Sequence, residues 1–193
     1  MRIVAGRHRG RNIIAPDGNE IRPTSDRVRE SVFNILEHRD WGTGGVSVLS
    51  GARVLDAFCG TGACGLEALS RGAAHVSFLD NTNSALDLCR RNIAALKEQE
   101  RTEILRSDCL KPVRPALPFD LVFMDPPYNK NLAARALQAL ANAGWMAAKA
   151  ICVVESGLSE EIPALNDFAL LEDRQYGSTR IRIFQHTKAA DDI

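Results

Sequence analysis

Hydrophobic residues follow two periodicities along this chain, and the change between them predicts its secondary structure. Within residues 22–38 the apolar side chains recur at the three- and four-residue spacing of one helix face. These side chains are Val28, Val32, Ile35 and Leu36. Thr24 or Ser25 is available to cap the first turn. We therefore predict one amphipathic helix before the main body of the chain.

From residue 52 onward, short apolar runs alternate with amphipathic segments. The runs predict strands at residues 52–58, 75–80, 102–108, 119–125 and 150–156, and the segments predict helices at residues 62–73, 83–99 and 132–144. Two further runs, 169–176 and 179–186, meet at Gly177-Ser178 and predict a hairpin. This alternation predicts a mostly parallel, seven-stranded, doubly wound α/β sheet that carries an antiparallel C-terminal hairpin strand.

The N-terminal segment has a different pattern. Two short apolar pieces, Ile-Val-Ala and Asn-Ile-Ile, flank Gly-Arg-His-Arg-Gly-Arg, which predicts a small hairpin or extended arm with arginines on its turn. Pro16-Asp17-Gly18 marks a turn after it. We expect a hairpin and helix in residues 1–45, an α/β domain in residues 46–187 and a tail in residues 188–193.

Composition excludes several classes of protein. The 193 residues are 45% hydrophobic and 25% charged, which is ordinary for a soluble globular chain. No apolar run approaches the roughly 20 residues of a membrane span, and no apolar stretch follows the first arginines as in a secretory signal. A cytoplasmic protein is expected. The five cysteines form no C-x-x-C pair, so neither a zinc site nor a disulfide framework is expected.

Charge is balanced overall but unevenly distributed. The formal net charge is zero, which argues against a uniformly basic surface. Residues 1–11 nevertheless contain four arginines and one histidine with no acid. Such a segment is either a solvated arm or a phosphate-contacting arm, for which arginine is well suited.

A glycine-rich turn follows the first strand of the predicted sheet. That strand ends at Asp56, and Gly60 and Gly62 precede the next helix with G-x-G-x-x-G spacing. Ligands of doubly wound folds bind beyond the carboxyl ends of the strands, and glycines let the backbone approach a nucleotide-type cofactor closely. Taken alone, the motif is equally compatible with a plain tight turn.

Acidic residues end the next two strands as well. Asp80, about 20 residues after the glycines, can accept both ribose hydroxyls, and Asp108 can accept an adenine amine. Each acid alone is more often a turn residue or a helix cap, but three at successive strand ends outline a site for adenosine. A dehydrogenase also fits the glycine motif, yet it has no reason to place Asp56 before it. That acid suits a cationic cofactor such as S-adenosylmethionine.

The fourth strand ends abruptly in Asp125-Pro126-Pro127-Tyr128. The two prolines stop regular structure and leave an acid and an aromatic ring at the same rim. The tetrapeptide matches the signature of methyltransferases that modify exocyclic amines. With the segments MRIVAGRHRGR, RPTSDRVRESVFNIL, DAFCGTGACGLEALSRGA and YGSTRIRIF, it makes nearly the whole chain resemble the RsmD family of bacterial 16S ribosomal RNA guanine-N2 methyltransferases.

The resemblance implies a Rossmann-like class I fold and methylation of a guanine N2 in 16S rRNA with base flipping. Asp125 and the Pro126 carbonyl would accept the amine hydrogens, and Tyr128 would stack on the base. A monomer that acts on the small ribosomal subunit or its assembly intermediate is expected, without a membrane or a metal. The implied cofactor-binding residues are Asp56, Phe58, Gly60, Thr61, Gly62, Asp80, Asp108, Cys109 and Asp125. The implied RNA-binding residues are Arg7, Arg9, Arg11, Arg22, Arg27 and Arg29.

Some alternatives stay open at this point. Asp80 is one methylene shorter than the glutamate that family members generally carry, and we expect it still to reach the ribose. The arginines also suit surface solubility or ion pairs with Asp26 and Glu30. The motif at Asp125 equally fits methylation of adenine N6 in DNA or RNA, or of a protein glutamine. A non-catalytic RNA-binding assembly factor would keep the same fold.

Overall fold

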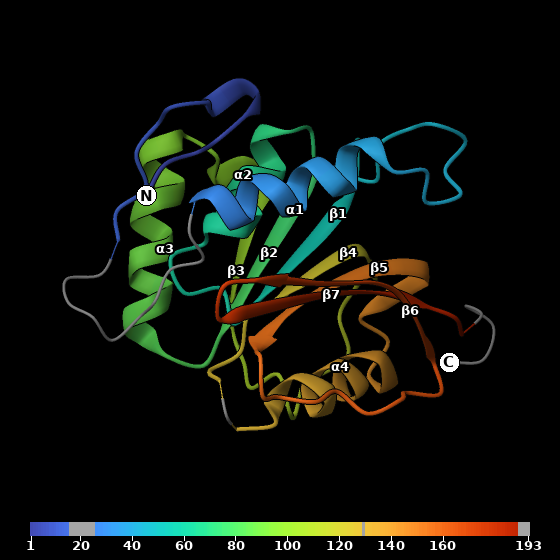
Figure 1. Cartoon of the computed structure of the whole chain (residues 1–193). Coiled ribbons are helices and arrows are strands. Elements are labelled where there is room, and N and C mark those ends of the chain that lie inside the picture. Colours follow the sequence, from blue (N-terminus) through green and yellow to red (C-terminus); the bar gives the residue numbers. More distant parts are fainter. Residues whose placement is uncertain (16–25, 129, 189–193) are drawn as a thin grey trace.

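One seven-stranded sheet runs through the computed structural model, which describes residues 1–15, 26–128 and 130–188 (Figure 1). The strands are β1 Arg53–Ala57, β2 His75–Asp80, β3 Thr102–Arg106, β4 Phe119–Met124, β5 Met146–Gly157, β6 Phe168–Tyr176 and β7 Thr179–His186. Their order in the sheet is β3-β2-β1-β4-β5-β7-β6. The order reverses at β1, where β2 lies on one side and β4 on the other.

Strand directions agree with the sequence-based prediction. β3, β2, β1, β4 and β5 pair in parallel, whereas β7 pairs antiparallel with both β5 and β6. The β6–β7 hairpin closes where Tyr176 pairs with Thr179, at the predicted Gly177-Ser178 turn. β5 begins earlier than predicted, at Met146, because an irregular register next to β4 lets it pair with Phe119 before its apolar run starts.

Helices cover both faces of the sheet. The α-helices are α1 Asp26–His38, α2 Ala63–Ser70, α3 Asn83–Leu96 and α4 Leu132–Asn142, and short 3-10 helices span Gly6–His8 and Gln99–Arg101. Side chains of α1, α2 and α3 are buried in one hydrophobic cluster, and those of α4 are buried in another. Figure 1 shows α4 on the opposite side of the sheet from α1 and α2.

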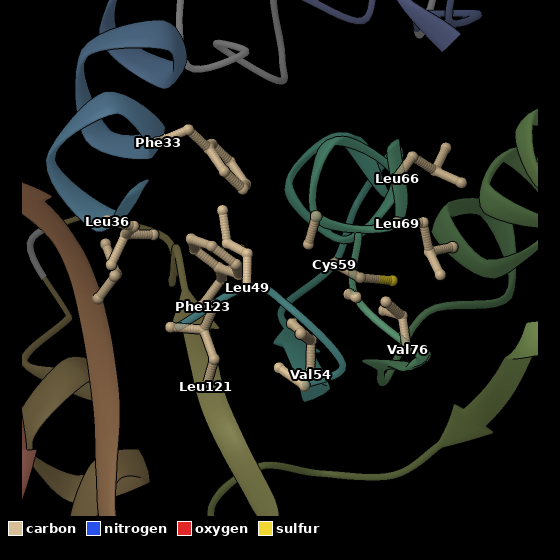
Figure 2. Close-up of a cluster of buried hydrophobic side chains, with 14 of the residues drawn as sticks. Phe33, Leu36, Leu49, Val54, Cys59, Leu66, Leu69, Val76, Leu121 and Phe123 are labelled. Atoms are coloured by element: carbon tan, nitrogen blue, oxygen red, sulfur yellow. The ribbon is translucent and has the colours of Figure 1, made fainter. Parts of the chain in front are cut away.

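Alternate side chains of each central strand point to opposite faces of the sheet and belong to different clusters. Leu121 and Phe123 of β4 face the first cluster, and Val122 and Met124 face the second. In the first cluster, Phe33 of α1 stacks on Phe123 with ring centroids 5.0 Å apart (Figure 2). Strands buried on both faces explain the nearly continuous apolar runs in the sequence.

The N-terminal segment forms the expected hairpin. Arg2 and Asn12 form an antiparallel bridge, and the Ile3 amide donates to the Arg11 carbonyl over 2.9 Å. Ile3 and Ile13 are buried in the same cluster as α1 and the sheet. Residues 1–15 therefore share a core with the α/β domain, and the boundary placed at residue 45 stays a prediction.

Two buried polar side chains attach this hairpin to the helices. Glu67 of α2 is fully buried and accepts the Val4 and Ala5 amides at 2.7 and 3.0 Å. Asn92 of α3 accepts the Ile14 amide at 2.8 Å and donates to the Thr61 carbonyl at 2.9 Å. Asn92 therefore connects the hairpin to the glycine-rich turn.

Some sequence features lie outside the described residues, namely the Pro16-Asp17-Gly18 turn, the helix caps Thr24 and Ser25, and Arg22. Across the described part of the chain, none of the helices combines the length and apolar character that crossing a membrane requires.

Candidate active site

Four carboxylates gather along the carboxyl edge of the parallel strands. In the register, Ala57 of β1 pairs with Leu79 of β2 and with Met124 of β4, and Met124 pairs with Val154 of β5. The residues Asp56, Asp80, Asp125 and Glu155 each lie within one position of these paired residues. The fold therefore brings together at one rim three acids that the sequence analysis selected and one, Glu155, that it did not.

The glycine-rich turn joins β1 to α2 through left-handed backbone. Gly60 has a φ of 51°, Gly62 one of 77°, and the non-glycine Phe58 one of 58°. A Cβ on Gly65 would lie 2.4 Å from the Phe78 ring, so this third glycine lets α2 pack closely on β2. The spacing G-x-G-x-x-G is thus used here both for a special turn and for helix–strand packing. A left-handed phenylalanine is backbone strain of a kind that clusters at ligand sites.

Asp56 is a buried acid that holds the start of α2. Its side chain is 5% exposed, and its Oδ2 accepts the Gly65 amide at 2.8 Å. Burial raises the pKa of Asp56 to about 7; the Gly65 hydrogen bond lowers it and the Asp80 charge adds to the rise. At neutral pH this site therefore holds a carboxyl close to its titration midpoint, ready to ionise beside a cation.

The raised pKa makes stability depend on pH. The folded protein binds the Asp56 proton more tightly than the unfolded chain, so this group stabilises the fold at low pH. As the pH rises from 3.8 to about 7, this contribution to the free energy of unfolding, up to about 4 kcal/mol, is lost. We expect Asp56→Asn, which keeps an acceptor for Gly65, to be more stable than the wild type at pH 8 and similar to it at pH 4. Urea unfolding at both pH values measures this; equal stabilities at pH 8 would contradict it.

Asp80 and Asp108 shape the neighbouring loops. Asp80 Oδ1 accepts both the amide and the hydroxyl of Thr82 at 2.9 Å, and its Oδ2 accepts the Gly60 amide at 3.3 Å. Asp108 is exposed, and its Oδ1 accepts the Leu110 amide at 2.9 Å. Both acids thus order the turns after their strands, Asp80 at the rim and Asp108 two residues beyond Arg106, the residue of β3 that pairs with Asp80.

Cys109 and Thr61 of the predicted cofactor set are largely buried. Cys109 is 2% exposed, and burial raises the pKa of its thiol to about 12 although the Phe58 backbone hydrogen bond opposes this. Thr61 is 6% exposed. The side chains of both residues are therefore packed inside the protein.

A small cavity of about 30 Å³ lies behind the rim, between α1 and strands β1, β4, β5 and β7. The polar groups on its wall are Arg29, Asp56, Cys64, Asp125 and Glu155. One guanidinium and three carboxylates therefore line the same small, mostly apolar cavity.

The interpretation of Arg29 as an RNA contact is wrong. Its side chain is 1% exposed, and its Nη2 donates to Asp26 Oδ1 at 2.8 Å and to the Arg2 carbonyl. Its Nε lies 3.9 Å from Glu67 Oε2. Arg29 is thus a buried group that braces α1 against the hairpin and α2, and it cannot reach a phosphate outside the protein.

The other arginines predicted to contact RNA differ in their solvent exposure and in their contacts within the protein. Arg9 and Arg27 are exposed. Arg7, whose side chain is 48% exposed, pairs with the buried Glu98, and Arg11 donates to the Ala95 carbonyl at 2.7 Å. Arg7 and Arg11 therefore also fasten the hairpin to the end of α3, and Arg22 lies outside the described residues.

The Asp125-Pro126-Pro127-Tyr128 segment follows β4 directly. Asp125 and Tyr128 are half-buried, Pro126 is buried and Pro127 is exposed. The Tyr128 hydroxyl donates to Glu155 Oε1 at 2.5 Å and lies 3.3 Å from Thr179 Oγ1. Burial, and next the Glu155 hydrogen bond, raise the pKa of Tyr128 well above its usual value. The ring therefore stays a neutral phenol, fixed at its hydroxyl end.

Sequence reasoning missed Glu67, Asn92 and Glu155. Glu155 carries a weak signal, because it is a charged residue at the end of the apolar run 150–154. Glu67 and Asn92 sit on helices where a single polar residue is unremarkable. Their roles depend on contacts with residues more than 60 positions away.

The sheet order, the reversed β7 and the carboxylate rim define the class I methyltransferase fold. Residues 1–185 match the model of the family described as Conserved hypothetical protein 95, so the chain belongs to this family, the RsmD family. The resemblance and the fold class predicted from the sequence are thereby confirmed.

Several relatives match nearly the whole chain. It is 32% identical over 190 residues to "Ribosomal RNA small subunit methyltransferase D" of Haemophilus influenzae, which covers 96% of this chain and 94% of that protein. The protein of the same name from Escherichia coli K12 is also 32% identical, with 96% and 89% covered. The solved "Putative methyltransferase yhhF from Escherichia coli" superposes with a TM-score of 0.81 at 32% identity, covering 97% and 98%.

A more distant structure shares the fold alone. The "SAM dependent methyltransferase from Aquifex aeolicus" superposes with a TM-score of 0.59 at 15% identity, covering 83% of this chain and 89% of that one.

Proposed function

We propose that this protein transfers a methyl group from S-adenosylmethionine to the exocyclic N2 amine of a guanine in small-subunit rRNA. The single observation that carries the proposal is the placement of Asp125 and Tyr128 at the carboxylate rim beside the glycine-rich turn. The relatives named small-subunit rRNA methyltransferases support RNA as the substrate.

The residues present fit the cofactor. The Gly60 position has open space around it, so the backbone there leaves room for a ligand. Asp80 and Asp108 offer acceptors at the next two strand ends, and Asp56 offers negative charge near a sulfonium. When bound, the cofactor supplies an electrophilic methyl group.

The chemistry at the target amine depends on positioning. The lone pair of guanine N2 is delocalised into the ring, so the amine is a poor nucleophile until its hydrogens are held. Asp125 and the Pro126 carbonyl supply two acceptors for those hydrogens, and the two prolines fix their direction. Alignment of this kind supplies much of a rate enhancement. Asp125 then takes the proton that the methylated amine releases.

The base must leave its stack to reach this rim. Tyr128 offers a ring on which an extruded guanine can stack, an interaction worth about 1–3 kcal/mol. The exposed Arg9 and Arg27 offer phosphate contacts on the hairpin and α1 side of the rim.

The second candidate is methylation of adenine N6, because an acid and a proline carbonyl can hold that amine equally well. A decisive experiment incubates the protein with methyl-labelled cofactor and small ribosomal particles that lack the modification. Mass spectrometry then locates the label. Label on a guanine N2 in rRNA supports the proposal; label on adenine, or label only in a parallel DNA reaction, overturns it.

The exposed arginines give a further prediction. We expect Arg9→Ala and Arg27→Ala each to weaken RNA binding and to lower the slope of log affinity against log salt by roughly 0.7–1. Filter binding of an rRNA fragment at several salt concentrations measures this slope. Arg135→Ala is the matched control, because Arg135 is also exposed but lies on α4, which packs on the opposite face of the sheet from α1. An unchanged slope for Arg9→Ala and Arg27→Ala would remove both residues from the interface.

A further inference from the structure

Glu155 is a buried acid at the rim with no assigned role. It lies near the end of β5, its side chain is 7% exposed, and it lines the same cavity as Asp125. One of its oxygens accepts the Tyr128 hydroxyl at 2.5 Å. A charge that is so deeply buried is costly to retain unless the group makes contacts of this kind.

The Tyr128 side chain is restricted at its backbone end, at its hydroxyl end and along the ring between them. Its chain end follows the two prolines, which restrict the backbone there. Its hydroxyl end lies between Glu155 of β5 and Thr179 of β7. In between, a Cβ on Gly157 would lie only 3.5–3.7 Å from the Tyr128 Cδ2, Cβ and Cγ atoms, so the ring packs on the bare backbone of β5. A half-buried ring held at both ends has one defined plane.

We propose that Glu155 is the positioning residue that sets the plane of Tyr128, and thereby the plane of the base that stacks on it. This rests on the proposed function. Tyr128 and Asp125 are three residues apart, so the orientation of the ring decides how an extruded base presents its amine to Asp125. Stacking alone leaves a base free to rotate and slide over a ring. A ring of fixed orientation next to a fixed acid removes that freedom, which is the entropic part of catalysis.

Loss of the Glu155 carboxylate is expected to affect kcat much more than KM. Without its acceptor, the ring remains present and a base still stacks, but the base is misaligned. We therefore expect Glu155→Ala to lower kcat by about 10- to 100-fold with little change in KM for the RNA. Glu155→Gln keeps an oxygen that accepts the phenol hydrogen and should restore most of the rate. Tyr128→Ala removes the stacking surface and should raise KM and lower kcat together.

A double-mutant cycle tests whether Glu155 acts through Tyr128. Tyr128→Phe removes the hydroxyl and keeps the ring. If Glu155 works through that hydroxyl, Glu155→Ala must have no further effect on kcat in the Tyr128→Phe background. Methylation rates on unmodified ribosomal particles, calorimetric affinity for S-adenosylmethionine and thermal unfolding are measured for every variant. Glu161→Gln, the same change at an exposed acid, is the control.

Each outcome decides the question. Unchanged cofactor affinity and unfolding, a kcat loss in Glu155→Ala, rescue by Glu155→Gln and full coupling to Tyr128→Phe support the proposal. Additive losses show that Glu155 acts on substrate directly or through the fold, and they overturn it, as does a normal kcat in Glu155→Ala. A wild-type protein that methylates no rRNA guanine overturns the proposed function instead, and is recognised before any variant is compared.

Discussion

Replacement of Asp125 by asparagine is expected to lower the rate of methyl transfer by about 10²- to 10⁴-fold. Asparagine keeps the shape of the side chain and one acceptor oxygen. It loses the negative charge that draws the proton from the amine, and it places an amide hydrogen where an acceptor is needed. The loss should appear in kcat, and Asp125→Ala should be at least as severe.

Cofactor affinity separates this effect from damage to the site. S-adenosylmethionine affinity, measured by calorimetry, should stay within about tenfold in both Asp125 variants, because removing one peripheral contact costs about 1 kcal/mol. Asp120→Asn is the matched control, since Asp120 is an exposed acid of β4, the strand that Asp125 follows, and it accepts the Arg53 amide at 2.9 Å. If Asp125→Asn methylates rRNA at the wild-type rate, the proposed proton acceptor is wrong.

Glu67→Ala should destabilise the protein by about 3–5 kcal/mol, the usual result of removing one partner from a buried ion pair. Glu67 is fully buried between α2 and the N-terminal hairpin, and its Oε1 accepts Arg71 Nε at 2.7 Å. The change leaves the Val4 and Ala5 amides without their acceptor and leaves Arg29 and Arg71 with less compensating charge.

Calorimetry or denaturant unfolding measures this effect. For a chain of this length, each kcal/mol corresponds to about 2–4 °C in Tm, so a fall of roughly 6–20 °C is expected. Glu37→Ala is the control, because Glu37 also pairs with Arg71 at 2.7 Å but is partly exposed, and its loss should cost about 1 kcal/mol or less. A Tm for Glu67→Ala equal to that of Glu37→Ala would show that Glu67 does not hold the hairpin.

The sequence was most informative where periodicity and position in a parallel sheet determine the structure. β2 was predicted with its observed bounds, and Asp56, Asp80 and Asp125 were placed at one rim because parallel strands end at the same edge. It was least informative for buried charges. Arg29 stands in an arginine-rich stretch and looks like a surface residue, yet its partners lie on the hairpin and on α2.

Arg182 is a second buried charge that the sequence did not reveal, in this case within a strand. Its alternation with Ile181 and Ile183 is typical of a strand with one polar, solvent-facing side. In the structure it is 5% exposed, and it donates to Ser156 Oγ and the Glu160 carbonyl, each at 3.1 Å. Both faces of β7 are covered there, and no local pattern records which loop covers a strand.

The position of β7 between β5 and β6 has a consequence for how the chain is made. A ribosome releases β1 to β5 first, and these strands can assemble as they emerge. The edge of β5 that faces away from β4 is paired by β7, Thr179–His186, which is synthesised after β5. Until those residues leave the exit tunnel, β5 presents unpaired amides and carbonyls, and the nascent protein is most exposed to misassociation at that edge.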